Sequence, residues 1–386
     1  MWRSLASNML TVLAVILFLV VGVILWGKRE YTAEGPLDTA ICLRVPGGST
    51  MSSVSRNLEE QGAISSGTIF RLGADYTDKS GQLKAGNFLV REHTSMQQIV
   101  DQITRGGAST CGSEIIYRIG VTRTLAELRE IDPAQLKQVE LAEFSLGVDE
   151  VPAIFAEKRK MSDTVFSVAV AEGVTSWQIV EALKAIDELS GEVGQVPQEG
   201  MLAPHSYEFS RGAERAALID RMETLQQERI AEVWESRKDD LPISTPEEML
   251  ILASIIEKET GVAEERRTVA SVFTNRLRTG MRLQTDPTVI YGITKGQGVL
   301  GRGLRQSELR RVTPWNTYVI EGLPPTPIAN PGLASLQAAV DPAETDFVFF
   351  VADGSGGHAF AATLEEHNRN VAKWREIEAE RAKQSE

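Results

Sequence analysis

Residues 249–261 read MLILASIIEKETG, and this stretch decides how the second half of the chain folds. Just before it, Thr245 can act as N-cap, Pro246 takes the first helical position and Glu248 follows three residues after the cap, which marks a helix start. Gly261 marks the helix end. The run between these signals is apolar almost all round, so we expect a buried helix.

Two glutamates stand at the end of this predicted helix. At about 100° per residue, Glu259 continues the apolar stripe of Leu252, Ile255 and Ile256, whereas Glu257 falls on another face. A carboxyl group held against aliphatic side chains loses hydration, which raises its pKa and lets it serve as a general acid near neutral pH. The alternative is a helix end that frays into water, with both glutamates solvated.

The sequence after the glutamates predicts a mixed α/β domain over residues 241–370. Asp286 precedes Pro287, which is typical of a turn and a helix start. A loop rich in Pro, Asn and aromatic residues follows, and such loops suit sugars or serve ordinary packing. The expected elements are a helix at 263–280, this loop at 313–332, a hairpin with strands at 346–352 and 358–362, and a charged helix at 363–386, of which 371–386 form a tail.

The start of the chain carries an uncharged apolar run. Residues 9–26 contain no charged side chain, and a helix of this length spans about 27 Å, close to one bilayer core. The run is long for a signal peptide and no A-x-A cleavage site follows it. We therefore predict a single transmembrane anchor within residues 1–29, followed by a polar linker at 30–40, with a cleaved signal peptide as the alternative.

A short pattern recurs between the linker and the second half of the chain. Each copy has an apolar run, a polar turn, a Ser or Thr that can act as N-cap, and apolar residues at helical spacing. This predicts a repeated βα unit in an α+β protein. We expect 41–110 to form one small α+β module and 111–240 to hold further βα units and a long helix at 213–240; the copies lie at 43–58, 88–103, 118–131 and 168–183.

Composition excludes some classes of function. The 386 residues allow two or three domains, and a net charge of −13 argues against a nucleic-acid binder. No CxxC, HExxH or Cys/His cluster occurs, so we expect no metal site and no cofactor. Outside the cytoplasm Cys42 and Cys111 could pair and tie the small module at both ends; two buried free thiols are the alternative.

The motifs together resemble the endolytic murein transglycosylases of the YceG-like, or MltG, family. The resemblance is nearly continuous from 249 to 368 and rests on SIIEKETG, MRLQTDPTVIYG, NTYVIEGLPPTPIANPG and FVFFVADGSGGHAF. The anchor and a small LysM-like module at 41–110 also fit this family. Its EGxxxPDTY element stands here as EGMLAPHSY, in which His205 replaces the usual Asp, so we give that position no catalytic role.

The resemblance implies cleavage of the β-1,4 bond between N-acetylmuramic acid and N-acetylglucosamine in peptidoglycan, without water, leaving 1,6-anhydro ends and ending the elongation of nascent strands. It implies that Glu259 protonates the leaving oxygen and that its conjugate base then takes the proton of the sugar's 6-hydroxyl. Asp286 could be a second acid, although a turn role suits it better. The motifs imply these substrate contacts: Gln284, Asp286, Tyr291, Asn316, Tyr318 and Asn330.

The resemblance also implies a location and partners. We expect a single-pass protein of the bacterial inner membrane, held through residues 9–26, with the catalytic domain in the periplasm. Peptidoglycan strands and peptidoglycan synthases are the expected partners, and nucleic acid is not. A hydrolytic muramidase and a non-catalytic wall-binding scaffold are the alternatives.

Overall fold

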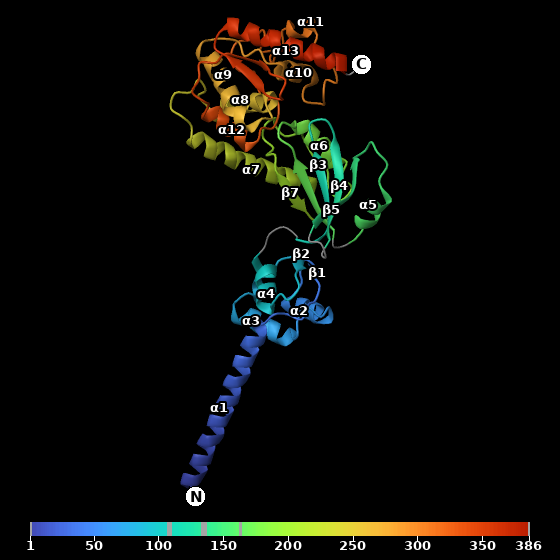
Figure 1. Cartoon of the computed structure of the whole chain (residues 1–386), viewed down its shortest axis with the longest axis vertical. Helices are drawn as coiled ribbons and strands as arrows, with labels where there is room; N and C mark the ends of the chain where they lie inside the picture. The colour runs from blue at the N-terminus through green and yellow to red at the C-terminus, as the bar shows by residue number, and fades with distance from the viewer. Residues whose placement is uncertain (1, 106–109, 133–136, 162–163, 385–386) are drawn as a thin grey trace. The chain divides into compact units, whose positions relative to one another are not determined.

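The computed structural model describes residues 2–105, 110–132, 137–161 and 164–384 (Figure 1). The chain is α+β and begins with an apolar helix, as the sequence predicts. It forms two compact units. One comprises Met1–Ile115, Glu127–Glu143 and Val151–Val165, and the other Ile116–Ala126, Phe144–Glu150 and Phe166–Glu386.

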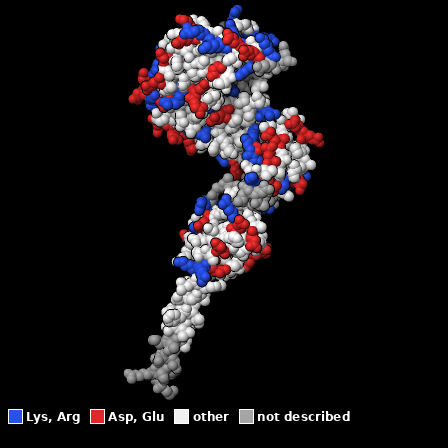
Figure 2. Space-filling model, in the orientation of Figure 1, with Lys and Arg blue, Asp and Glu red and all other residues white. Residues whose placement is uncertain are grey.

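The N-terminal helix α1 runs from Trp2 to Thr32. Its part Val12–Thr32 is long and apolar enough to cross a membrane, judged by length and composition. Figure 2 shows the described apolar part of this helix as a white column without charged side chains. The apolar side chains from Val12 to Trp26 are almost all exposed.

A small α+β module follows α1. Strands β1 and β2 pair antiparallel, with Ile41 opposite Val90, and two helices connect them. Thr50 caps α2 as the first copy of the pattern predicts, and Ser66 caps α3; each hydroxyl accepts a backbone N–H of the first turn. The elements are β1 Ile41–Val45, α2 Met51–Glu60, α3 Gly67–Tyr76, the 3₁₀ helix η1 Ser80–Gln82, β2 Gly86–Val90 and α4 Met96–Arg105.

A disulfide joins Cys42 to Cys111 in the structure. Cys42 lies on β1 and Cys111 stands immediately before the next strand, 69 residues further along the chain. The bond therefore ties the first strand of the module to the segment that leaves it.

A five-stranded sheet has the order β5-β4-β3-β6-β7. The edge strand β7 pairs antiparallel with β6, with Phe166 opposite Phe209. The helix α6 follows β6 and begins after the cap Thr175. The elements of this region are β3 Gly112–Ile119, β4 Thr124–Asp132, β5 Lys137–Ser145, α5 Ala153–Lys158, β6 Val165–Val170, α6 Ser176–Lys184 and β7 Ser206–Phe209.

The prediction of a helix in the third copy of the βα pattern is wrong. Residues 124–131 belong to strand β4 and not to a helix. Leu125 and Leu128 stand three positions apart, which suits a helix, but Ala126 and Leu128 stand two apart and are both fully buried. Hydrogen bonding to β3 and β5 on either side makes this segment a strand. The other three copies each form a strand followed by a helix.

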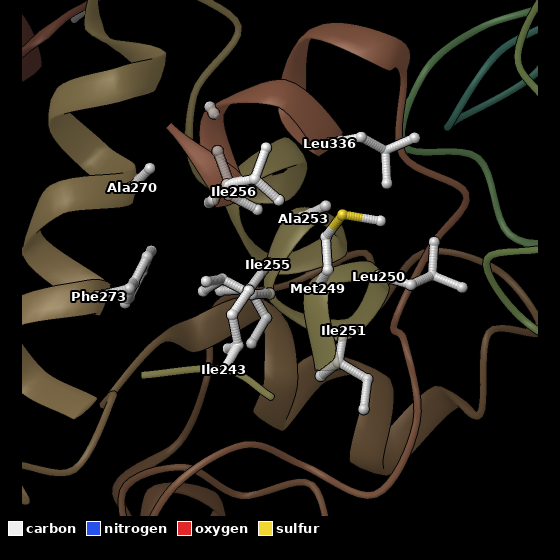
Figure 3. Packing of buried hydrophobic residues seen from close by; sticks show 14 of the residues in the cluster. Ile243, Met249, Leu250, Ile251, Ala253, Ile255, Ile256, Ala270, Phe273 and Leu336 are labelled. Atoms are coloured by element: carbon white, nitrogen blue, oxygen red, sulfur yellow. The ribbon is translucent and has the colours of Figure 1, made fainter. Parts of the chain in front are cut away.

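The last part of the chain is built around helix α8, the helix that the quoted stretch predicts. The helices α7, α9, α10 and α12 all contact α8, and Figure 3 shows its aliphatic side chains pointing outward in several directions into this packing. The elements are α7 Arg215–Glu235, α8 Pro246–Glu259, the 3₁₀ helix η2 Ala263–Glu265, α9 Arg266–Arg278, α10 Asp286–Thr294, α11 Gln306–Leu309, α12 Leu333–Val340, β8 Phe349–Ala352, β9 His358–Ala361 and α13 Leu364–Gln384.

Candidate active site

Glu259 is the last residue of α8, where a buried helix reaches a partly open edge. Leu252, Ile255 and Ile256 below it are fully buried, while Glu259 keeps some accessible surface. Protein atoms crowd around its carboxyl group, and this loss of hydration is the first cause that raises its pKa. The residue therefore lies at the edge of the core, and its carboxyl group holds its proton more tightly than that of a free glutamate.

Thr285 sets the hydrogen bonding of the Glu259 carboxyl. Its hydroxyl donates to Oε1 of Glu259, which lowers the pKa and partly offsets the effect of burial. Thr285 is itself held, because its backbone N–H donates to Oγ1 of Thr317 at 3.1 Å. With Oε1 occupied by a donor, the acidic proton belongs on Oε2, which can give it to a substrate oxygen.

Three ionisable groups act on the Glu259 carboxyl. The carboxylate of Asp286 raises its pKa, while His358 and Arg276 lower it. Arg276 is a buried cation whose guanidinium donates to the carbonyls of Leu283 and Val348. No pattern in the sequence points to Arg276, since an arginine in the last turn of a helix usually faces solvent.

Glu257, the other glutamate of the quoted stretch, has a different environment. Its Oε2 accepts the backbone N–H of Gly332, the residue before α12, at 2.9 Å. Between the two glutamates, Nζ of Lys258 donates to the carbonyl of Gly173 at 3.2 Å. These contacts hold neighbouring segments together, so the helix end does not fray and the two glutamates are not equivalent.

Asp286 and Tyr318, two of the expected substrate contacts, lie beside Glu259. The hydroxyl of Tyr318 donates to Oδ1 of Asp286 at 2.7 Å, and the Glu259 charge acts on the Tyr318 hydroxyl. Gln284 immediately precedes Thr285, is exposed and has a φ of 47°. That left-handed conformation is uncommon for a residue with a side chain and is more frequent at functional sites.

Tyr291, a third expected contact, turns away from Glu259 toward another carboxyl group. Its hydroxyl donates to Oε2 of Glu199 at 3.2 Å, and its ring packs against Trp315. Glu199 also accepts the backbone N–H of Ser176 at 2.8 Å and so caps α6; burial raises its pKa. His205, in the same sequence element, is exposed.

Asn316 and Asn330, the remaining expected contacts, are fully buried. The amide of Asn316 donates to three backbone carbonyls of the segment before it. The amide of Asn330 donates to the carbonyl of Val174 and accepts the N–H of Leu202, both at 2.9 Å. These bonds fix the loops around the site.

Glu265 and His358 form a pair that our sequence analysis did not single out. Oε1 of Glu265 accepts the backbone N–H of His358 at 2.8 Å, and Oε2 lies 3.0 Å from its Nδ1. His358 belongs to the motif GHAF, which in the sequence indicates only the family resemblance. Among the described residues, no group of three or more His, Cys, Asp or Glu side chains is arranged to hold a metal ion.

Comparison with known proteins shows which family the chain belongs to. The YceG-like family matches residues 43–373. This protein belongs to the YceG-like family. The match extends well beyond the motifs at 249–368 and confirms the resemblance predicted from them.

Relatives of this YceG-like protein carry a common name. The endolytic murein transglycosylase of Bacillus subtilis strain 168 is 29% identical over 356 residues, which are 92% of this chain and 90% of that protein. The endolytic murein transglycosylase of Streptococcus pneumoniae D39 is 28% identical over 86% of this chain, which spans 58% of the pneumococcal protein's length. A crystal structure of a yceG-like protein from Listeria monocytogenes is 25% identical, with a TM-score of 0.45, and covers 86% of this chain and 98% of that one.

Proposed function

We propose that this protein is a lytic transglycosylase that cleaves the glycan strands of peptidoglycan. The relatives that match it along most of its length are named for this activity on murein. The observation that carries the proposal is Glu259, a partly exposed residue at the edge of the core whose pKa is raised by burial and whose Oε1 accepts the Thr285 hydroxyl. A general acid near neutral pH needs such a raised pKa.

The proposed reaction begins with proton transfer from Glu259 to the oxygen that links N-acetylmuramic acid to N-acetylglucosamine. The bond from that oxygen to C1 of the muramic residue breaks, the 6-hydroxyl of the same sugar attacks C1, and the proton that this hydroxyl loses restores the ionised Glu259. The product carries a 1,6-anhydro end and no water is consumed. An inverting hydrolase would need a second carboxylate set to activate water, whereas Asp286 accepts the Tyr318 hydroxyl.

Digestion of purified murein sacculi tests the proposal. Wild-type protein should release fragments with anhydro ends, while Glu259→Gln should release none, because glutamine carries no acidic proton. Glu264→Gln removes an exposed glutamate of η2 and should act as wild type. Release of anhydro fragments by Glu259→Gln at the wild-type rate would show that another group is the acid.

Mass spectrometry of the same fragments separates the proposal from its alternatives. Anhydro ends and reducing ends differ by one water, so reducing ends alone would identify a hydrolytic muramidase. A wall-binding scaffold would sediment with sacculi and release nothing at any protein concentration.

We further propose that α1 anchors the protein in the inner membrane, with the rest of the chain in the periplasm. The exposed apolar side chains between Val12 and Trp26 support this, because such a surface is costly in water. A reporter fused after residue 386 should be active only outside the cytoplasm, and detergent but not salt should release the protein from membranes. Cytoplasmic reporter activity would contradict the orientation.

The small module at 41–110 is proposed to be LysM-like and to bind glycan strands. Its two antiparallel strands joined by two helices support this assignment. In the periplasm the protein would hold strands near peptidoglycan synthases and end their elongation. Sedimentation of the full-length Glu259→Gln protein with sacculi tests the binding, and failure to sediment would contradict it.

A further inference from the structure

Glu265 grips His358 at two points. One carboxylate oxygen accepts the backbone N–H of His358 and the other meets Nδ1 of its ring, at 2.8 Å and 3.0 Å. The glutamate comes from η2 and the histidine begins strand β9, so two segments distant in sequence meet here. A Cβ on Gly357 would come within 2.4 Å of Oε1 of Glu265, so the grip needs glycine before the histidine.

This grip fixes both the orientation and the tautomer of the His358 ring. A carboxylate accepts hydrogen bonds, so in the neutral ring the proton sits on Nδ1 and the lone pair is presented on Nε2. The ring of Phe350 packs edge to face against the imidazole, with centroids 5.1 Å apart, and resists its rotation. No described group hydrogen-bonds Nε2 of His358, and its side chain remains 15% exposed.

The segments that hold His358 and Glu259 meet at Arg276. Its guanidinium donates to the carbonyl of Leu283, just before the threonine that binds Glu259, and to the carbonyl of Val348, just before β8, the strand that pairs with β9. The charge that His358 carries when protonated also lowers the pKa of Glu259.

The other groups that act on Glu259 are engaged. Arg276 donates to these two carbonyls, and the Tyr318 hydroxyl donates to Oδ1 of Asp286. The Nε2 atom of His358 is thus a proton acceptor near the proposed acid, and its rivals among the described groups are the second oxygen of Asp286 and the ionised Glu259 itself.

We propose that His358 is a second catalytic residue, which takes the proton from the 6-hydroxyl of the muramic residue as that hydroxyl attacks C1. This role rests on the proposed transglycosylase reaction. In the first step Glu259 gives its proton to the leaving oxygen and the glycosidic bond breaks. In the second step the bond from O6 to C1 forms, the O6–H bond breaks, and the proton moves to Nε2.

The imidazolium formed in this step keeps the Glu265 carboxylate at Nδ1. Glu265 stabilises its charge at Nδ1, as a carboxylate does for a histidine base in other enzymes. The proton on Nε2 then returns to the ionised Glu259, which restores both groups. The cycle balances without water or any further reactant.

The test measures two quantities on intact glycan strands, the rate of cleavage and the share of reducing ends among the products. Loss of a general base slows its step by on the order of 10²-fold or more. In His358→Gln, attack by the 6-hydroxyl should slow by this factor, and water should capture part of the cleaved sugar, so that reducing ends appear. Glu265→Gln should change both quantities in the same direction but less. The matched control is His205→Gln, an exposed histidine, which should match wild type in both.

Each outcome decides a separate point. Wild-type rate and wholly anhydro ends from His358→Gln would overturn the proposal, and a shift to reducing ends in Asp286→Asn alone would give the role to Asp286. If His358→Gln is folded but inactive, free imidazole added to His358→Ala decides. If imidazole restores anhydro products, the role is supported. If it restores no anhydro products, the role is overturned. Failure of the proposed function would instead show as absence of anhydro ends from the wild type.

Discussion

At the scale of single residues, two glutamates on one helix differ because of what surrounds each carboxyl group. Glu257 accepts a backbone N–H at the start of α12, whereas Glu259 faces a threonine hydroxyl and three ionisable groups. Two positions along one helix separate a supporting role from a proposed catalytic one. The pKa of Glu259 is the quantity on which the proposed reaction depends.

Thr285→Val should move the alkaline limb of the pH–rate profile to higher pH. Glu259 must be protonated to act, so activity falls as pH rises through its pKa. The Thr285 hydroxyl lowers that pKa, and valine, which lacks the donor, lets it rise further. Muropeptide release measured across pH tests this, with Thr285→Ser as the control that keeps a hydroxyl. A limb that moves to lower pH would be inconsistent with the assignment.

Glu259→Gln should stabilise the folded protein at neutral pH. The unfolded chain ionises this residue near its ordinary value of 4.5, while burial raises the pKa in the folded state. The wild type therefore loses stability as pH rises from that value through the raised pKa, and glutamine does not. Melting temperatures of the two proteins should be equal near pH 4 and should favour the variant at pH 7.5. Equal values at both pH values would contradict a raised pKa.

At the scale of elements, the site is an assembly of segments that α8 and two buried asparagines hold in place. Met249 and Leu250 at the start of α8 and Ile255 and Ile256 near its end are all buried, so its last residue cannot move independently of the core (Figure 3). Asn316 and Asn330 tie loops by bonds to main-chain groups. These contacts predict a structural effect for residues that the motifs alone assign to substrate.

Asn330→Ala should lower the free energy of unfolding by about 2 kcal/mol, because it leaves the buried N–H of Leu202 without its acceptor and removes the side-chain donor to the carbonyl of Val174, which keeps the backbone N–H of residue 330. Urea unfolding of the detergent-solubilised chain measures this. The control is Gln284→Ala at an exposed position, which should cost less than about 1 kcal/mol and raise KM for glycan strands. An Asn330→Ala protein with unchanged stability but a raised KM would restore its substrate role.

At the scale of the whole molecule, the chain combines an apolar helix, a small disulfide-linked module and a larger second unit. The module has two short strands and a small core of its own, and small cores benefit most from cross-links. The second unit has a large core around α8 and no cysteine. The two parts should therefore respond differently to reduction.

Cys42→Ser with Cys111→Ser should lower the stability of the module by about 4 kcal/mol, the value that the chain-entropy model gives for a loop of 69 residues. Calorimetry should show one transition moving to lower temperature while a second keeps its position, and sacculus digestion should persist. Adding a reductant to the wild type should reproduce the shift. Loss of both transitions together would contradict independent stabilisation.

The sequence by itself determined the local elements, because caps, glycines and apolar periods act within one turn or one strand. Thr245 and Pro246 began α8, Gly280 followed α9, and the apolar stripe singled out Glu259. The tertiary structure decided what depends on partners distant in sequence. Pairing with neighbouring strands made residues 124–132 a strand. Hydrogen bonds to buried main-chain groups fixed the side chain of Asn330. Glu265 and His358, 93 positions apart, met only because the fold brings η2 to β9, which no local pattern encodes.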